Sequence, residues 1–210
     1  MIMDIFIDCE TAPTNAKWFI DEIEIKAPDN YKKPESIAKW LEDNEATERQ
    51  NVIDRTAVDN SLAQTICIGY AIGNGPVQTL TGRESDIIAE LFSELEPYRH
   101  VRLIGHNIIA FDIPLIFHRA IINGIRPHSA FHMNYKPWDS DCFDTMTQWA
   151  GHRDRISQHR LAQLLDIPTQ EETGADILDL YRNSDIEGVQ RKCAFDVEQN
   201  RAIYNRILGL

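Results

Sequence analysis

The first eleven residues show the clearest hydrophobic pattern in the chain. Met1–Thr11 is apolar on both faces until its last few positions, which is typical of a central strand that is covered on both sides. Side chains on a strand alternate between faces, so Ile5 and Ile7 point one way while Asp8 and Glu10 point the other. The pattern therefore predicts a central strand that carries two neighbouring carboxylates out of the core at its C-terminal end.

Strand and helix patterns alternate in the second part of the chain. From Gln64 onwards, two runs rich in β-branched residues flank Gly73–Pro76 and predict a hairpin. The remaining patterns predict strands at Val101–Gly105 and Asp141–Thr145. They also predict a helix at Glu84–Tyr98, one that follows the strand Val101–Gly105 and reaches about Asn123, and three more at Ser157–Leu165, Ala175–Arg182 and Asp185–Leu208. Strands that alternate with helices indicate an α/β layer fold with some parallel pairing.

A polar, irregular stretch separates the first strand from the hairpin. It covers residues 12–60 approximately, and Pro34 opens an amphipathic helical segment within it. We therefore expect one domain over residues 1–210 with a helical insertion at about 12–60. The insertion contains four large aromatic residues, which we expect to pin it to the core rather than to stack on bases: Trp18, Phe19, Tyr31 and Trp40.

Composition limits the class of protein. A chain of 210 residues with 43% hydrophobic and 26% charged residues can bury one sizeable core. It has no apolar run of membrane-spanning length, and it begins with a strand pattern rather than a secretory signal, so we expect a cytoplasmic protein without a membrane partner. The four cysteines lie far apart in the sequence and form no C-x-x-C pair, so neither a zinc site nor a disulfide framework is indicated.

The net charge of −12 argues against broad, nonspecific adhesion to nucleic acid. It does not exclude a nucleic-acid enzyme, because bound metal ions can supply positive charge at a phosphate. One segment, Gly151–Arg160, is locally basic. It is expected either to approach a phosphate backbone or to be a solvated loop and helix start.

The carboxylates at the end of the first strand suggest metal chemistry. Asp8 and Glu10 repel each other unless a proton or a cation lies between them, and oxygen ligands suit a hard ion such as Mg²⁺ or Mn²⁺. The alternative is that the pair is merely the polar end of a strand.

Two further aspartates can likewise be either structural or part of a site. Asp112 follows a predicted strand and opens a helix, where it is either an N-cap or part of a site at the C-terminal ends of the strands. Asp196 lies within the last predicted helix, at the edge of its apolar stripe, where a carboxylate is costly unless paired. Lys192, one turn earlier, can form an ordinary helical ion pair with it.

In combination these motifs resemble a known superfamily. Asp8 and Glu10 on a first strand, H-N-x-x-x-F-D ending at Asp112, and C-x-x-D-V around Asp196 resemble the DEDD (DnaQ-like) 3′–5′ exonucleases. More narrowly, the chain is similar to the predicted exonucleases related to the proofreading domain of B-type DNA polymerases. This resemblance extends to YKKPESIAKWLED, ICIGYA, LAQLLDIP and DLYRNSDIEGVQRKCAFDV, and so covers most of the chain. It implies a ribonuclease H-like fold with a mixed five-stranded sheet flanked by helices.

The resemblance also implies an activity and a site. The activity is removal of 5′-mononucleotides from the 3′ end of single-stranded DNA by two divalent metal ions, Mg²⁺ or Mn²⁺. The implied metal ligands are Asp8, Glu10, Asp112 and Asp196. The implied contacts to the terminal nucleotide are Thr11, Asn107 and Phe111. Phe111 is a lone aromatic residue, and it is equally compatible with stacking on a base and with core packing.

One position departs from the superfamily pattern. The residue that orients the attacking water is a tyrosine four residues, or a histidine five residues, before the last aspartate, and here those positions hold Lys192 and Arg191. The spacing favours the tyrosine branch with Lys192 as the replaced catalytic residue. Three functions therefore stay open: an active DNA exonuclease, a degenerate nuclease fold that only binds nucleic acid, and a 3′–5′ exoribonuclease acting on RNA.

Overall fold

The central element is a mixed sheet in which the first strand lies in the middle. The computed structural model describes residues 2–170 and 174–210. Its five strands are β1 (Met3–Ala12), β2 (Gln64–Ile72), β3 (Gln78–Thr81), β4 (Val101–Gly105) and β5 (Cys142–Asp144), arranged in the order β3-β2-β1-β4-β5. β1 is antiparallel to β2 and parallel to β4. The predicted central strand, the hairpin and the mixed five-stranded sheet are confirmed.

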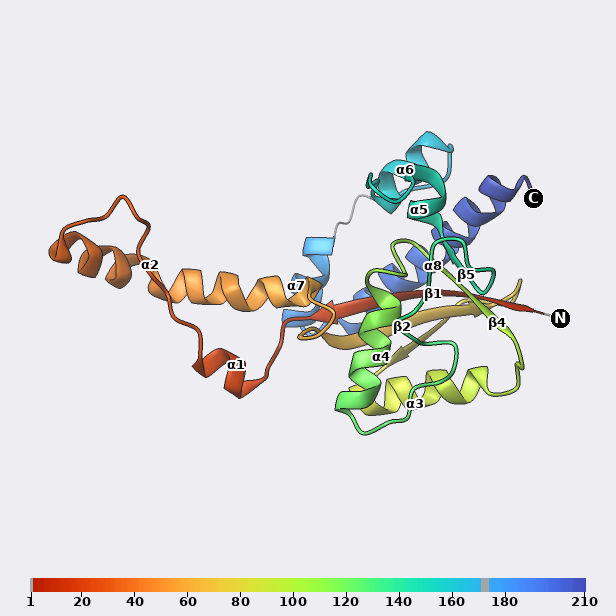
Figure 1. The fold of residues 1–210 in the computed structure, drawn as a ribbon, viewed down its shortest axis with the longest axis horizontal. Helices are drawn as coiled ribbons and strands as arrows, with labels where there is room; N and C mark the ends of the chain where they lie inside the picture. Colours follow the sequence, from red (N-terminus) through yellow and green to blue (C-terminus); the bar gives the residue numbers. More distant parts are fainter. Residues whose placement is uncertain (1, 171–173) are drawn as a thin grey trace.

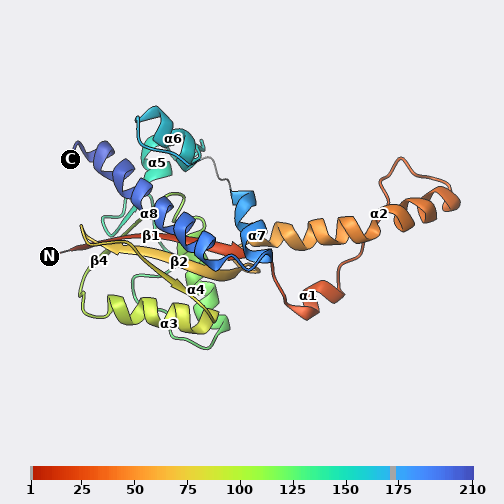
Figure 2. The same ribbon diagram turned by 180° about the vertical axis from the view of Figure 1, so that it is seen from behind.

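Helices cover both faces of this sheet (Figures 1 and 2). They are α3 (Glu84–Leu95), α4 (Asp112–Ile122), α5 (Thr145–Ala150), α6 (Gln158–Leu164), α7 (Gly174–Arg182) and α8 (Ile186–Leu208). On one face, Ile5 and Ile7 belong to the main core with α3 and α4. On the other, Phe6 packs with Val197 and Tyr204 of α8, so the alternation predicted for the first strand is confirmed. None of the helices in the described ranges has both the length and the apolar character needed to cross a bilayer.

A glycine lets α8 approach the sheet closely. Gly69 of β2 lies opposite Asp8 of β1, and a Cβ atom at this position would lie 2.9 Å from Cys193 Sγ and 2.9 Å from Val197 Cγ2. Both distances are shorter than van der Waals contact, so any larger residue would push α8 outward or displace its side chains. This close packing brings the middle of α8, including its charged residues, next to the C-terminal half of β1.

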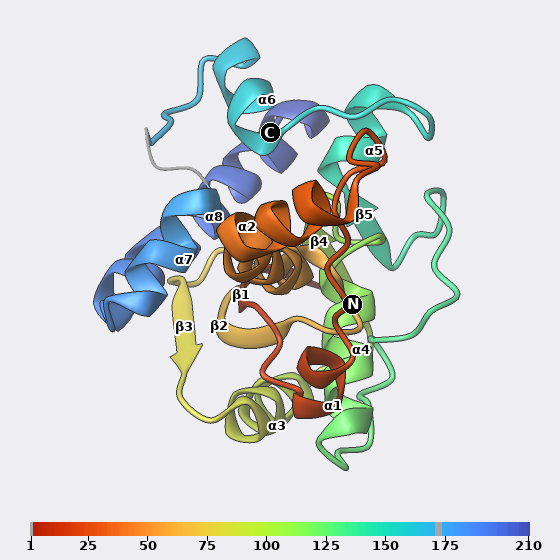
Figure 3. The same cartoon turned by 90° about the vertical axis from the view of Figure 1, so that its left-hand side faces the viewer.

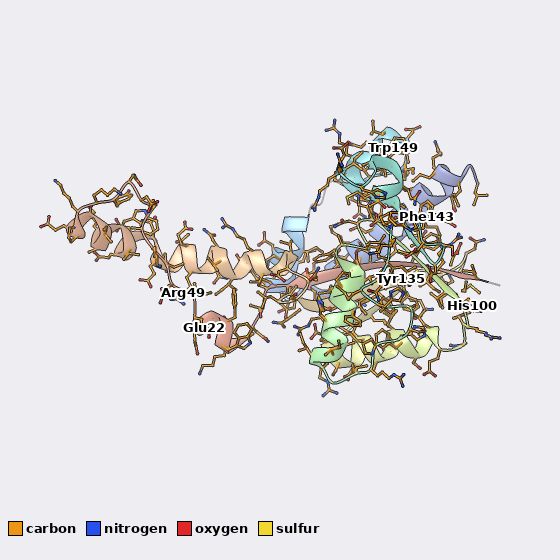
Figure 4. All side chains as sticks on the ribbon, in the orientation of Figure 1. Glu22, Arg49, His100, Tyr135, Phe143 and Trp149 are labelled. Atoms are coloured by element: carbon orange, nitrogen blue, oxygen red, sulfur yellow. The ribbon has the colours of Figure 1, made fainter. Side chains whose placement is uncertain are left out.

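Residues after β1 form an arm that projects away from the sheet (Figures 1 and 3). The arm contains α1 (Lys17–Asp21), α2 (Pro34–Arg55) and the short 3₁₀ helix η1 (Thr56–Val58). Arg49 of α2 donates hydrogen bonds to the carbonyl oxygens of Ile20 and Ile23, at 3.0 and 2.9 Å, and so holds the two sides of the arm together. Figure 4 shows Arg49 on α2 and Glu22 in the segment that it braces.

The expectation that aromatic residues pin this segment to the core is wrong. Trp18 is 61% exposed, and its ring contacts the neighbouring Phe19. Tyr31 contacts Trp40 within the arm, with ring centroids 6.2 Å apart. No residue of α2, which is described in full, is buried. The aromatic residues therefore pack within the arm, because the arm extends beyond the reach of the core.

Candidate active site at the end of the central strand

The Asp112 side chain bonds to β1 just beyond the point where the pairing between β1 and β4 ends. The pairing between β1 and β4 ends at Phe6 and Ile104, so the backbone N–H of Cys9 has no acceptor from β4. Asp112 Oδ1 accepts this N–H at 3.0 Å. The N-cap interpretation of Asp112 is wrong, because Phe111 occupies the N-cap position of α4 and the Asp112 carboxylate bonds to a different strand.

The two carboxylates of β1 face α8. Ligand atoms of Asp8, Glu10 and Cys193 lie within 4.8 Å of one another. The Cys193 thiol donates to the Asp8 carbonyl oxygen at 3.5 Å and approaches Asp8 Oδ2 at 3.9 Å. Glu10 Oε1 is buried and accepts no hydrogen bond from any described residue. This is not a solvated strand end, because a buried carboxylate oxygen without a donor is costly unless a proton or a cation satisfies it.

Asp196 and Lys192 of α8 complete the cluster. Lys192 Nζ donates to Asp196 Oδ2 at 2.6 Å, so the helical ion pair expected between them is present. The Lys192 side chain is only 10% exposed. Its ammonium group is also close enough to Asp8 and Glu10 for their charges to raise its pKa, so Lys192 offsets part of the negative charge of the cluster.

Burial raises the pKa values of three of these carboxyl groups, and repulsion between carboxylates adds to the shifts. The pKa of Asp8 is well above its usual range, first because of burial and then because of Asp196, Glu10 and Asp112. Burial raises the pKa of Glu10 to about 7, against the attraction of Lys192. Burial likewise raises the pKa of Asp112 to about 7, although hydrogen bonds such as that from Cys9 oppose the shift.

Lys192 stays charged in this environment. Burial alone would lower its pKa, but Asp196, Glu10 and Asp8 together raise it above its usual value. An ammonium group has three donors and no acceptor, so the residue acts here as a donor and a positive charge.

The structure adds a residue that the sequence motifs did not indicate. Asp144, at the end of β5, is 1% exposed and accepts hydrogen bonds from the backbone N–H groups of Asn107 and Ile109, at 3.0 and 3.2 Å. It also caps α5 through Met146 N at 3.0 Å. Asp144 therefore holds the loop between β4 and α4, in which Asn107 has a φ of 59°. Its position at the end of a predicted strand, like that of Asp8, was the signal that could have revealed it.

The residues expected to contact a nucleotide lie in different environments. Thr11 donates its hydroxyl to the Ala57 carbonyl oxygen at 2.6 Å, so this hydroxyl fixes the base of the arm. Asn107 keeps a buried Oδ1 without a donor among the described residues. Phe111 is partly buried and packs against the main core, which favours the packing interpretation of its ring.

The mixed sheet and its acidic cluster define an α/β protein of the ribonuclease H-like class. The chain belongs to the family of predicted 3′–5′ exonucleases related to the exonuclease domain of PolB, whose sequence profile matches residues 71–209. This range includes Asp112, Lys192 and Asp196, while Asp8 and Glu10 precede it. The match confirms the resemblance inferred from the sequence motifs.

Among solved structures, the chain is similar to the family B DNA polymerase from the hyperthermophilic archaeon Pyrobaculum calidifontis, with a TM-score of 0.61 and 10% identity. The similarity covers 99% of this chain and 25% of the polymerase chain, so this chain spans about a quarter of the polymerase's length. At this identity the comparison shows the fold alone, and it confirms the ribonuclease H-like fold. No curated protein sequence matches the chain.

The raised carboxyl pKa values lead to a prediction for the metal-free protein. A carboxyl group whose pKa is raised on folding favours the folded state at low pH, and this contribution is lost as pH rises through the folded-state value. For Asp112 the loss falls between about pH 4, the usual pKa of an aspartate, and about pH 7, its pKa in the folded protein. The variant Asp112→Asn, which keeps an acceptor for Cys9, should therefore melt at a higher temperature than the parent at pH 8 in EDTA.

The expected gain is several degrees, since 1 kcal/mol shifts Tm by roughly 2–4 °C at this chain length. At pH 4 the two proteins should melt at similar temperatures. Asp43→Asn, at an exposed position of α2, is the matched control and should not change the pH dependence. A lower Tm for Asp112→Asn at pH 8 would show that the charged carboxylate stabilises the fold.

Proposed function

We propose that this protein is a metal-dependent 3′–5′ exonuclease that removes 5′-mononucleotides from single-stranded DNA. The observation that carries the proposal is the convergence of four carboxylates from three elements, β1, α4 and α8, around one end of the central strand. Structural carboxylates are normally hydrogen-bonded or solvated, whereas here the pKa values of Asp8, Glu10 and Asp112 are raised and Glu10 Oε1 has no donor among the described residues. Such perturbed groups are typical of functional sites.

The residues present fit divalent cations. Asp8, Glu10, Asp112 and Asp196 offer only oxygen ligands, which suit Mg²⁺ or Mn²⁺, and the unsatisfied Glu10 Oε1 would gain a partner. When bound there, two such ions would polarise an attacking water and neutralise charge on the leaving 3′ oxygen. In a chain of net charge −12, such ions would add positive charge at the phosphodiester.

In this proposal Lys192 acts on the phosphate rather than on the water. Its raised pKa keeps the ammonium group charged at neutral pH, so it does not accept a proton as a general base would. With cations held by Asp196, the Lys192 ammonium group would be able to donate to a phosphate oxygen on which charge develops. A buried donor of this kind stabilises the transition state more than the ground state.

The same lysine supports a second candidate function. Lys192 Nζ donates to Asp196 Oδ2 at 2.6 Å, and Lys192 occupies the position that holds the water-orienting tyrosine in the tyrosine branch of the related exonucleases. A protein in which this pair persists would bind single strands without turnover. The two functions differ in whether nucleotides are released.

Digestion of end-labelled strands tests the proposal. With Mg²⁺ or Mn²⁺, a 5′-labelled DNA strand should shorten stepwise from its 3′ end and release 5′-mononucleotides, and EDTA should stop the reaction. Asp8→Asn should lower the rate about 100-fold or more, because it removes charge and a ligand where the metals act. Asp43→Asn on the arm is the control.

Three results would contradict parts of the proposal. Cleavage of a closed single-stranded DNA circle would indicate an endonuclease, and shortening of RNA but not DNA would make the substrate class wrong. Binding of DNA without release of nucleotides in either metal would favour the second candidate.

Substitution of Lys192 separates a catalytic donor from a structural ion pair. Lys192→Met keeps the apolar stem but removes the donor, and it should lower the rate about 100-fold in saturating Mn²⁺. Lys192→Tyr restores a hydroxyl at the position of the family tyrosine and should recover part of the activity. The neighbouring Arg191 is the matched control, because its side chain is 67% exposed, and Arg191→Ala should keep the parent's rate.

The rate of Lys192→Met relative to the parent should stay constant from pH 6 to 8, since a charged donor does not titrate in this range. If Lys192→Met and the parent hydrolyse DNA at equal rates, the lysine is only the ion-pair partner of Asp196.

A further inference from the structure

Two exposed tryptophans lie on neighbouring segments of the chain. Trp138 is 74% exposed and Trp149, at the end of α5, is 47% exposed. Gln148 of α5 donates to the Pro137 carbonyl oxygen at 3.1 Å, and the Trp138 ring contacts His152 edge-on with centroids 6.1 Å apart. Figure 4 shows Trp149 at the side of the molecule formed by α5 and α6. Two solvent-exposed indole rings on neighbouring segments are suited to stacking on bases.

The segment that follows Trp149 carries positive charge. Residues 151–160 contain three arginines, Arg153, Arg155 and Arg160, and two histidines, against one acidic residue, Asp154. Arg153 and Arg155 are exposed, and neither forms an ion pair with another residue in the described ranges. In a chain of net charge −12, such a local excess of positive charge favours the approach of a polyanion at this place.

Two hydrogen bonds attach this segment to the carboxylate cluster. His106 Nε2 donates to the Ile156 carbonyl oxygen at 2.8 Å, and His106 directly precedes Asn107. Gln158 Nε2 donates to the backbone carbonyl oxygen of Asp196 at 2.8 Å. The basic segment therefore follows directly after Trp149, and within it Ile156 and Gln158 contact the residue before Asn107 and the backbone of Asp196.

We infer that Trp138, Trp149 and residues 151–160, together called the flanking surface, bind the part of a single DNA strand that lies upstream of its 3′ end. The arginines would contact phosphates and the indole rings would stack on bases, without sequence preference. This inference rests on the proposed function for the position of the 3′ end, but it concerns binding rather than hydrolysis. It predicts that affinity rises with strand length beyond the nucleotides that the carboxylate cluster can hold.

Fluorescence anisotropy with 5′-fluorescein-labelled dT4 and dT20 in EDTA tests the inference, because binding is then measured whether or not the protein hydrolyses DNA. The parent should bind dT20 at least about tenfold more tightly than dT4. Trp149→Ala should weaken dT20 binding roughly fivefold or more, and Trp149→Phe, which keeps an aromatic ring, should retain most of the affinity.

The double variant Arg153→Ala/Arg155→Ala should reduce the slope of log K against log salt by about 1.4, because each phosphate that an arginine neutralises on a single strand adds about 0.7 to this slope.

Two exposed residues elsewhere serve as matched controls. Trp18→Ala changes a tryptophan of the arm that is 61% exposed, and Arg99→Ala changes an exposed arginine next to His100, which Figure 4 shows at the opposite end of the molecule from the arm. Both should bind dT20 like the parent. The inference is overturned if the parent binds dT4 and dT20 equally. It is also overturned if the flanking-surface variants keep the parent's affinity and salt slope, or if the controls weaken binding as much.

Discussion

The gathering of four carboxyl groups at one end of β1 is the constraint on which the rest of this structure depends. Burial raises the pKa values of Asp8, Glu10 and Asp112, and the charge of Asp196 adds to the shifts of Asp8 and Glu10. Lys192 opposes the shifts of Asp8 and Glu10, and hydrogen bonds oppose that of Asp112. Such a cluster lowers stability at neutral pH unless protons or cations occupy it. A fold that retains it therefore gives up stability for a site with a high affinity for positive charge, a trade typical of functional sites.

Three features of the backbone hold the carboxylates in place despite their repulsion. β4 leaves β1 after Phe6, and this leaves the Cys9 N–H free to bind Asp112. Gly69 admits α8 close to the sheet, so Asp196 lies near enough to Asp8 for its charge to raise the pKa of Asp8. Asp144, which lies outside the motifs shared with the superfamily, fixes the loop that leads into α4. Each feature acts on the backbone, so the geometry is set before any cation binds.

The sequence predicted what depends on local periodicity and missed what depends on distant contacts. The alternation in β1 gave the correct faces for Ile7 and Asp8, and the turn at Gly73–Pro76 gave the hairpin. The local sequence pattern did not predict that Trp18 would remain exposed, because the direction of the arm follows from contacts such as that of Arg49 with Ile20. Asp112 also looked like an N-cap, since its real partner, the Cys9 N–H, lies 103 positions away in the sequence.

The central claim is that these carboxylates form one binding site for divalent cations, and proton release on binding tests it most directly. At pH 6.5, groups with a pKa of about 7, Glu10 and Asp112, are largely protonated, so Mn²⁺ must displace protons from them. Isothermal titration calorimetry in two buffers of different ionisation enthalpy should show saturable binding with proton release at pH 6.5 and less release at pH 8. Absence of saturable binding, or binding without proton release at pH 6.5, would contradict the account.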